Sequence, residues 1–418
     1  MAVLGQGYVG LTLACAAASE GFPVTGIDID GERVDRLSRG ELCVAGVPDS
    51  DFRSGLASGK LTLSTEPTAI EEADVVLICV PTPLRDHTPD LSFVQNATRR
   101  VAEHLRPGSL VVLESTTYPG TTDEILVPIL ETSGLRAGRE FLVAYSPERI
   151  DPGNDEYGLR NTPKVVGGST PEATGVANLF YGQLVDKVVL VSSCRAAELA
   201  KLMENTFRHV NVALANEMAM LCHEMDIEVW EVIDAAASKP FGFMTFYPGP
   251  GVGGHCIPLD PTYLSWQVRR KAGRQFRILE QAQDINVQMP SYVAARIGDV
   301  LNEVGKAVNG ATVLVLGVAY KPDVGDIRES PALQVMALLK RRGARVTFHD
   351  PYVESVAING ESLRRTDLST HSLVTSDCVA LLTPHRAYDF GWIGDHAPLI
   401  FDARNAFQAD RRANVIRL

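Results

Sequence analysis

The chain has 418 residues and a formal net charge of −12, with 45% hydrophobic and 22% charged residues. This length predicts two or three domains, and the composition is that of a globular protein. The acidic balance argues against a broad nucleic-acid or anionic-membrane surface, so neither partner is expected. No apolar run reaches the length of a membrane span, and no signal peptide precedes the first apolar run. The seven cysteines include no CxxC pair and no zinc spacing, which favours a reduced cytoplasmic protein without a metal site.

The first half alternates short apolar runs with helical patterns, which predicts a parallel β-sheet with crossover helices. Near-continuous hydrophobicity indicates strands that are buried on both faces. The expected strands are Ala2–Leu4, Val24–Ile27, Val75–Val80, Leu110–Glu114, Phe141–Tyr145, Lys164–Val166 and Lys187–Val191. Because the first of these begins at Ala2, we expect a few residues to be missing upstream of Met1.

From Ser193 the pattern changes to a helical spacing without proline or glycine, which predicts one long helix ending near Glu224. Further helical segments follow until Gly305, interrupted by the glycine- and proline-rich loop Phe241–Pro261. Strands are expected again at Thr312–Leu316, Arg345–Phe348, Cys378–Leu382 and Pro398–Phe401. We therefore expect an α/β protein with a Rossmann-like doubly wound parallel sheet in residues 1–192. A central helical domain should occupy 193–305 and a smaller Rossmann-like domain 306–418.

A glycine-rich turn, Gly5-Gln6-Gly7-Tyr8-Val9-Gly10, follows the first strand and opens a helical pattern, and Asp28 ends the next strand. Gly5 allows a tight turn, Gly7 lets the backbone approach a pyrophosphate, and Gly10 lets helix and strand pack closely. An acid at position 28 accepts a hydrogen bond from a ribose 2′-hydroxyl and repels a 2′-phosphate, which favours NAD over NADP. A tight turn that binds nothing is the alternative. The expected NAD contacts here are Gly5, Gly7, Tyr8, Val9, Gly10, Asp28 and Arg33.

Two further segments end predicted strands, at the edge where a parallel sheet binds its ligand. They are Val80-Pro81-Thr82-Pro83 and Glu114-Ser115-Thr116-Thr117. Their hydroxyl groups could serve only local turns. We favour contact with the cofactor because both segments fall on the expected edge. The residues concerned are Pro81, Thr82, Ser115 and Thr116.

The most informative segment runs from Pro248 to Asp260 and contains four glycines within six residues, followed by Cys256. A backbone without side chains lets a ligand approach closely. A thiol acts as a nucleophile when a helix N-terminus or a cation lowers its pKa. A lone cysteine is more often an inert buried residue, yet the composition of this loop favours a nucleophile.

A second constellation lies on the predicted long helix, where Lys201 and Asn205 are one turn apart and project from one face, with Glu198 one turn earlier. This face borders the apolar stripe of the helix, where a lysine is unusual unless it is paired. The alternative is a solvated helix flank.

Together these segments resemble the UDP-glucose/GDP-mannose dehydrogenase family over essentially the whole chain. The resemblance rests on Gly5–Gly10, Ser146-Pro147-Glu148-Arg149, Lys201 with Asn205, Gly253-Gly254-His255-Cys256, and Lys321-Pro322-Asp323 with Arg328-Glu329-Ser330. It implies an NAD-dependent, four-electron oxidation of the C6 hydroxymethyl of a nucleoside-diphosphate sugar. A homodimer built on the long helix is also implied.

The resemblance also assigns roles to particular positions. The implied catalytic residues are Cys256, Lys201, Asn205, Asp260, Glu148 and Thr116. Further cofactor contacts are implied for Thr116, Glu148 and Arg328. The expected substrate-binding residues are Glu148, Arg149, Lys201, Asn205, Tyr247, Gly251, Gly253, His255, Cys256, Lys321 and Arg404.

Two departures from the UDP-glucose branch bear on the substrate. His255 stands where that branch has a small residue. That branch also has a second glutamate after the Pro-Glu motif, and here its role is either absent or taken by Asp151. The loops look closest to UDP-N-acetylglucosamine 6-dehydrogenases, which makes UDP-N-acetylglucosamine the expected substrate. UDP-glucose, dTDP-glucose and UDP-N-acetylmannosamine are alternatives. A two-electron hydroxyacid dehydrogenase and an inactive sugar-nucleotide-binding module are the competing readings.

Overall fold

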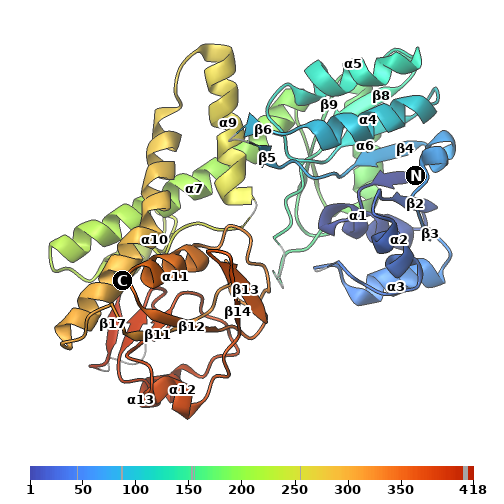
Figure 1. Cartoon of the computed structure of the whole chain (residues 1–418). Coiled ribbons are helices and arrows are strands. Elements are labelled where there is room, and N and C mark those ends of the chain that lie inside the picture. The colour runs from blue at the N-terminus through green and yellow to red at the C-terminus, as the bar shows by residue number, and fades with distance from the viewer. Residues whose placement is uncertain (45, 86–87, 152–153, 155, 255, 408–412) are drawn as a thin grey trace. The chain divides into compact units, whose positions relative to one another are not determined.

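The computed structural model describes residues 1–418 except 45, 86–87, 152–153, 155, 255 and 408–412 (Figure 1). The chain divides into two compact units. The first unit comprises Met1–Glu204 and Thr262–Gly273, and the second comprises Asn205–Pro261 and Arg274–Leu418.

The first unit contains an eight-stranded sheet with the strand order β10-β9-β8-β7-β4-β1-β2-β3. All neighbours are parallel except β8 and β9, which need no crossover helix because they are antiparallel. This sheet confirms the expected Rossmann-like α/β fold. Its strands are β1 (Ala2–Leu4), β2 (Val24–Ile27), β3 (Leu61–Ser64), β4 (Val75–Ile78), β7 (Leu110–Leu113), β8 (Leu142–Tyr145), β9 (Lys164–Gly168) and β10 (Val188–Leu190).

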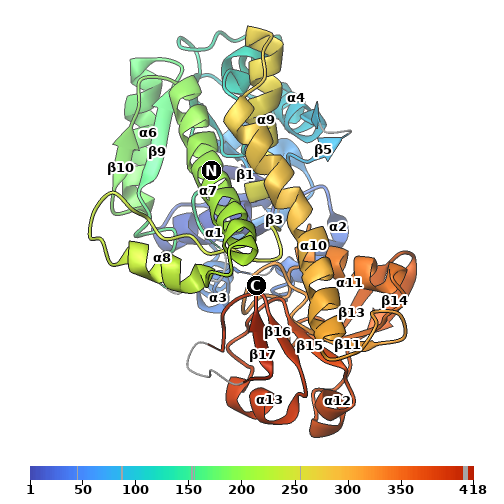
Figure 2. The ribbon, with the colours of Figure 1, turned by 90° about the vertical axis from the view of Figure 1, so that its left-hand side faces the viewer.

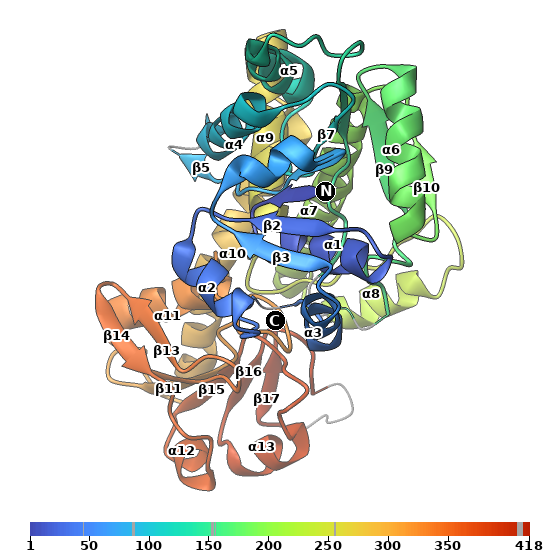
Figure 3. The ribbon, with the colours of Figure 1, turned by 90° about the vertical axis from the view of Figure 1, so that its right-hand side faces the viewer.

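Helices cover both faces of this sheet, which explains why its strands are hydrophobic throughout (Figure 3). One face packs against α1 (Tyr8–Ser19), α3 (Asp49–Ala57) and α6 (Pro171–Leu184). The other packs against α4 (Ser92–His104), α5 (Val127–Leu130) and the first turn of α7 (Cys194–Glu224). The short helix α2 (Gly31–Ser38) follows β2.

The second unit contains a five-stranded parallel sheet with the order β12-β11-β15-β16-β17, which confirms the expected C-terminal α/β part. Helices α10 (Arg277–Glu303) and α11 (Pro331–Arg341) pack on one face. Helices α12 (Thr370–Val374) and α13 (Phe390–His396) pack on the other. The strands are β11 (Thr312–Leu316), β12 (Arg345–His349), β15 (Cys378–Leu381), β16 (Ile400–Asp402) and β17 (Val415–Arg417), and β13 (Ser355–Ile358) and β14 (Glu361–Arg364) form a separate hairpin.

The middle of the chain is helical, as expected: α7 runs from Cys194 to Glu224 and is followed by α8 (Val229–Ala237) and α9 (Cys256–Ala272) (Figure 2). The chain passes from the first unit to the second between Glu204 and Asn205, inside α7. Within the described ranges, no helix is both long enough and apolar enough to cross a membrane.

Candidate active site

The glycine-rich turn between β1 and α1 uses its three glycines for three different purposes. Gly5 has a φ of 90°, and a Cβ there would overlap the carbonyl of Cys79. A Cβ at Gly10 would overlap the carbonyl of Gly5, so this glycine brings helix and strand together. A Cβ at Gly7 would meet nothing within 4 Å, which leaves the N-terminus of α1 open to a ligand. This combination is the one that a pyrophosphate requires.

Asp28 lies at the end of β2 with its carboxylate fixed by three donors. Its Oδ2 accepts from the backbone N–H of Gln6 at 2.7 Å and from Arg33 Nη1 at 3.0 Å, and its Oδ1 accepts from the N–H of Asp30 at 3.0 Å. A carboxylate oxygen can accept two hydrogen bonds, so Oδ1 can take a hydroxyl donor as well. Arg33, an expected cofactor contact, is thereby held against Asp28.

The two other expected cofactor segments follow β4, which is a neighbour of β1 in the sheet, and β7, which is the next strand beyond β4. Because these strands are parallel, their carboxyl ends share one edge with Gly5. Ser115 Oγ donates to the carbonyl of Val80 at 2.8 Å and so joins the two segments. Thr82 is buried, whereas Pro81 is exposed and Thr116 is partly exposed at the same edge.

Glu148 and Arg149 lie in the loop after β8 and both are tied to the first unit. Glu148 Oε1 accepts from the N–H groups of Arg149 at 2.6 Å and Ile150 at 2.5 Å. The Arg149 guanidinium donates to the Pro163 carbonyl at 2.6 Å and pairs with Glu204 of α7 at 2.8 Å. Arg149 therefore holds this loop in place, and its expected contact with substrate stays a prediction.

Next to this loop lies a buried ion pair that the sequence pattern did not predict. Lys164 Nζ lies 2.6 Å from Glu114 Oε2, and the Tyr181 hydroxyl donates to Glu114 Oε1. The available signal was a lysine at the start of an otherwise apolar strand, where a charge needs a partner.

The polar residues Glu198, Lys201 and Asn205 of α7 have two different settings. Lys201 is only 8% exposed, and one turn later Asn205 Nδ2 donates to Asp260 Oδ2 at 2.5 Å, with both of these side chains buried. Glu198, in contrast, accepts from the N–H groups of Gly120 and Thr122 at 2.6 and 2.8 Å. Burial raises the pKa of the Glu198 carboxyl to about 7 despite these donors. Glu198 thus anchors a loop, whereas Lys201 and Asn205 stand on the predicted face.

The glycine-rich loop before α9 packs closely against the protein itself. Gly251 and Gly254 have φ values of 130° and 83°, and the N–H of Gly254 donates to the Arg328 carbonyl at 3.0 Å. A Cβ at Gly254 would lie 2.8 Å from the Tyr320 ring, and one at Gly253 would lie 2.8 Å from the Glu329 carbonyl. Within the second unit these glycines admit the 320–331 segment, and their expected role in ligand approach stays a prediction. His255 and the side chain of Cys256 lie outside the described residues, while Cys256 begins α9.

The remaining expected substrate contacts, and Arg328 as an expected cofactor contact, occupy different settings in the second unit. The ring of Tyr247 stacks on Trp230 with centroids 5.9 Å apart. Arg328 is exposed and pairs with Asp326, and Lys321 Nζ lies 6.0 Å from the ring centroid of the adjacent tyrosine. Arg404 Nε donates to the Leu382 carbonyl at 3.1 Å, and burial lowers the pKa of this guanidinium to about 10.

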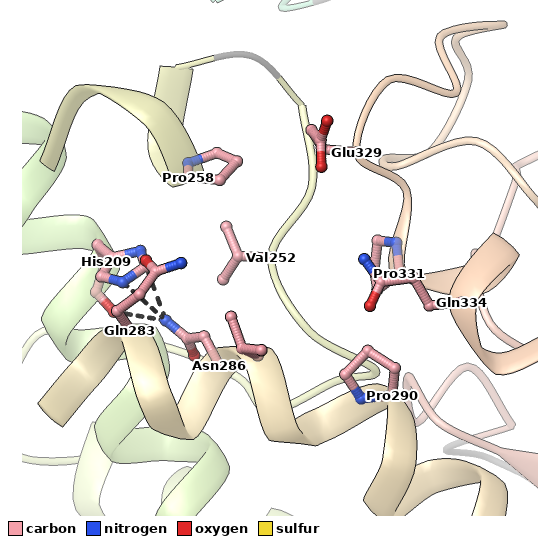
Figure 4. A pocket seen from close by; sticks show the side chains of 10 residues that line it. His209, Val252, Pro258, Gln283, Asn286, Pro290, Glu329, Pro331 and Gln334 are labelled. Carbon is pink, nitrogen blue, oxygen red and sulfur yellow. Dashed lines mark hydrogen bonds between the residues drawn. The ribbon is translucent and has the colours of Figure 1, made fainter. Parts of the chain in front are cut away.

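A cavity of about 100 Å³ lies beside the glycine-rich loop in the second unit (Figure 4). His209, one turn beyond Asn205 on α7, contributes to its wall and is 1% exposed. Asn286 Oδ1 accepts from Asn216, whose own amide oxygen accepts from the N–H of Gly249 at 3.0 Å. This chain of amides ties the loop to α7 and α10. The other lining residues are Val252, Pro258, Gln283, Val287, Pro290, Glu329, Pro331 and Gln334.

The first unit thus carries the glycine-rich turn of a dinucleotide-binding fold with a carboxylate after its second strand, and the second carries a glycine-rich loop that leads into a helix beginning at a cysteine. These features define an NAD-dependent dehydrogenase. The chain belongs to the UDP-glucose/GDP-mannose dehydrogenase family, whose NAD-binding, central and UDP-binding domains match residues 1–185, 195–288 and 314–409. It is accordingly an NAD-dependent nucleotide-sugar dehydrogenase.

Individual relatives are similar over nearly the whole chain. A UDP-N-acetyl-D-mannosamine dehydrogenase of Pyrococcus horikoshii is 36% identical over 413 residues, which cover 97% of this chain and 95% of the relative. The enzyme of the same name from Escherichia coli K12 is 34% identical and covers 93% of this chain and 94% of its own length. The solved structure of the Pyrococcus UDP-D-ManNAc dehydrogenase superposes with a TM-score of 0.89 at 34% identity, covering 100% of this chain and 98% of that one.

Proposed function

We propose that this enzyme oxidises the C6 hydroxymethyl of UDP-N-acetylmannosamine to a carboxylate and forms two NADH per sugar. The observation that carries the proposal is the buried hydrogen bond between Asn205 and Asp260. Asp260 lies one turn after Cys256 on α9, so within the second unit this bond joins the start of the cysteine helix to Asn205 of α7. In general, a thiol nucleophile assisted by an amide donor and a lysine is suited to trapping an aldehyde.

The proposed reaction has two oxidations and one hydrolysis. The C6 hydroxyl would lose its proton to a water or side chain held by Asp260 and Lys201, while the C6–H bond breaks and its hydride would pass to NAD. Cys256 adds to the aldehyde, and Lys201 and Asn205 stabilise the resulting oxyanion. Loss of a second hydride from the Cys256 adduct, for which a further NAD would be the acceptor, would leave a thioester. Glu148 then activates the water that releases the carboxylate.

The choice of sugar rests on the two relatives reported above, both named for UDP-N-acetyl-D-mannosamine. The loop motifs alone favoured UDP-N-acetylglucosamine, which differs at one stereocentre. In both sugars the C6 chemistry is the same. The 2-acetamido sugars are therefore proposed as the substrate class, with the manno isomer preferred.

The experiment that tests this function measures NADH formed per mole of sugar with UDP-N-acetylmannosamine, UDP-N-acetylglucosamine, UDP-glucose and dTDP-glucose in parallel. We expect two NADH from the manno sugar and a lower kcat/KM for the others. The Cys256→Ser variant should lose at least about 10³-fold in kcat, since it lacks the covalent step. Cys222→Ser, which alters a buried cysteine on α7 in the second unit, serves as the control. One NADH per sugar, or full turnover by Cys256→Ser, would point to a two-electron dehydrogenase instead.

We further infer a homodimer in which α7 supplies an apolar contact surface. Along this helix, exposed apolar side chains recur at spacings of four and seven residues, which places them on one face. They are Leu199, Met203, Phe207, Leu214 and Leu221. Such a row is more apolar than the exposed face of a helix usually is, and a second copy would cover it.

A further inference from the structure

The buried pair of Lys164 and Glu114 has no role in the reaction described above. Lys164 begins β9 and is 3% exposed, and Glu114 follows β7. Removing two charges from water costs about as much as their attraction returns, so a buried ion pair seldom stabilises a fold more than apolar residues would. The pair is therefore not explained by a contribution to folding stability, and its position beside Glu148 suggests a role in function.

The pair lies directly behind Glu148. Lys164 Nζ is 3.9 Å from Glu148 Oε2 and donates to the carbonyl of Pro147 at 3.3 Å. The other oxygen of Glu148 is already occupied by the two backbone N–H groups of Arg149 and Ile150. Glu148 Oε2 is buried and takes no hydrogen bond from the described residues. One oxygen is thus anchored by the backbone, while the other faces a cation and can still accept a proton donor.

The charge of Lys164 is maintained by its surroundings. Burial alone would lower the pKa of its ammonium, but the carboxylates of Glu114 and Glu148 outweigh burial and raise that pKa above its ordinary value. The other titratable groups around the pair are Tyr181 on α6 and Cys79 after β4. Burial raises the pKa of both, so both are neutral and leave Lys164 as the cation beside Glu148.

We propose that Lys164, held by Glu114, is a positioning residue that keeps the Glu148 carboxylate oriented for hydrolysis of the thioester. In this step a water oxygen bonds to the acyl carbon while its proton passes to Glu148 Oε2. The C–S bond then breaks, and its electron pair leaves with the sulfur of Cys256. The resulting carboxylic acid loses its proton to solvent. This inference rests on the proposed function, since only a covalent thioester requires such a step.

The test separates oxidation from hydrolysis by rapid-mixing measurement of NADH with excess UDP-N-acetylmannosamine and NAD. In Lys164→Met we expect a burst of two NADH per active site at the wild-type rate. The following steady-state rate should fall about 10-fold or more, a part of the roughly 10²–10⁴-fold that a positioned base supplies. Acid quenching and intact-protein mass spectrometry should show an acyl adduct. Lys164→Arg should restore most of the steady-state rate, because it keeps the cation.

Lys187→Met is the matched control, because Lys187 is an exposed lysine beside Lys164 at the start of the neighbouring strand. It should behave as wild type. Because Lys164→Met leaves Glu114 buried without its cation, a Lys164→Met/Glu114→Leu variant removes both charges and should show the same slow hydrolysis in a well-folded protein.

Two results would overturn the inference: an unchanged steady-state rate in the folded double variant, or a burst that slows in parallel with it. Failure of the proposed function looks different. In that case the wild-type enzyme itself would not form two NADH per sugar.

Discussion

His209 is a buried imidazole one turn from Asn205, and its burial has a consequence for stability. Burial lowers the pKa of His209 to about 4, whereas the unfolded chain takes up this proton near pH 6.5. Between these values the unfolded state binds a proton that the folded state does not. Stability that is fully present above pH 6.5 is therefore lost as the pH falls towards 4, by about 1.4 kcal/mol per pH unit.

We expect His209→Gln to reduce this loss, because glutamine does not titrate. The measurement is urea unfolding at pH 7.5 and pH 5.5, comparing the change in the free energy of unfolding with that of the wild type. His371→Gln, at an exposed histidine of α12, should leave the wild-type dependence unchanged. An equal acid sensitivity in wild type and His209→Gln would contradict the assignment.

The glycine-rich loop before α9 shows how an element can be constrained by its neighbours. Gly254 combines a positive φ with a tight approach to the Tyr320 ring, whereas Gly305 at the end of α10 has a φ of 73° and open space where its Cβ would lie. A left-handed alanine costs roughly 1–2 kcal/mol at either position. At Gly254 it must also displace the ring, which adds roughly 1–3 kcal/mol.

Gly254→Ala should therefore destabilise the protein more than Gly305→Ala and also lower kcat/KM, because this loop leads into Cys256. Denaturant unfolding of the two variants, together with NADH assays, checks both expectations. Equal losses in the free energy of unfolding would show that the loop and the Tyr320 ring move apart without an energetic penalty.

The exposed apolar face of α7 predicts the oligomeric state of the protein. Light scattering should report a particle of twice the 45.3 kDa chain mass. A Met203→Glu/Leu214→Glu variant should shift it to one chain, since each charge would otherwise be desolvated in the interface. Leu179→Glu provides the control, because Leu179 is equally apolar and 70% exposed but lies on α6. A wild-type particle of a single chain mass would exclude the dimer.

The fold itself could be predicted largely from hydrophobic pattern. Strands with continuous apolar runs, such as β1 and β7, were placed within a residue of their observed bounds. The strand β3 at the sheet edge was missed, because only its first residue is buried and its pattern is short. The last strand, β17, was missed for the same reason: its three residues are all only partly buried.

In the candidate site, features that depend on local sequence could be predicted, whereas contacts between distant residues could not. Sequence determined the dinucleotide turn, because the conformational demands on Gly5, Gly7 and Gly10 arise within one βα unit, and it determined the helical spacing of Lys201 and Asn205. Only the tertiary structure decided that Arg149 is held by Glu204, that the loop glycines admit the 320–331 segment, and that Lys164 stands behind Glu148. These contacts join residues far apart in the chain, and their formation depends on packing that no local pattern records.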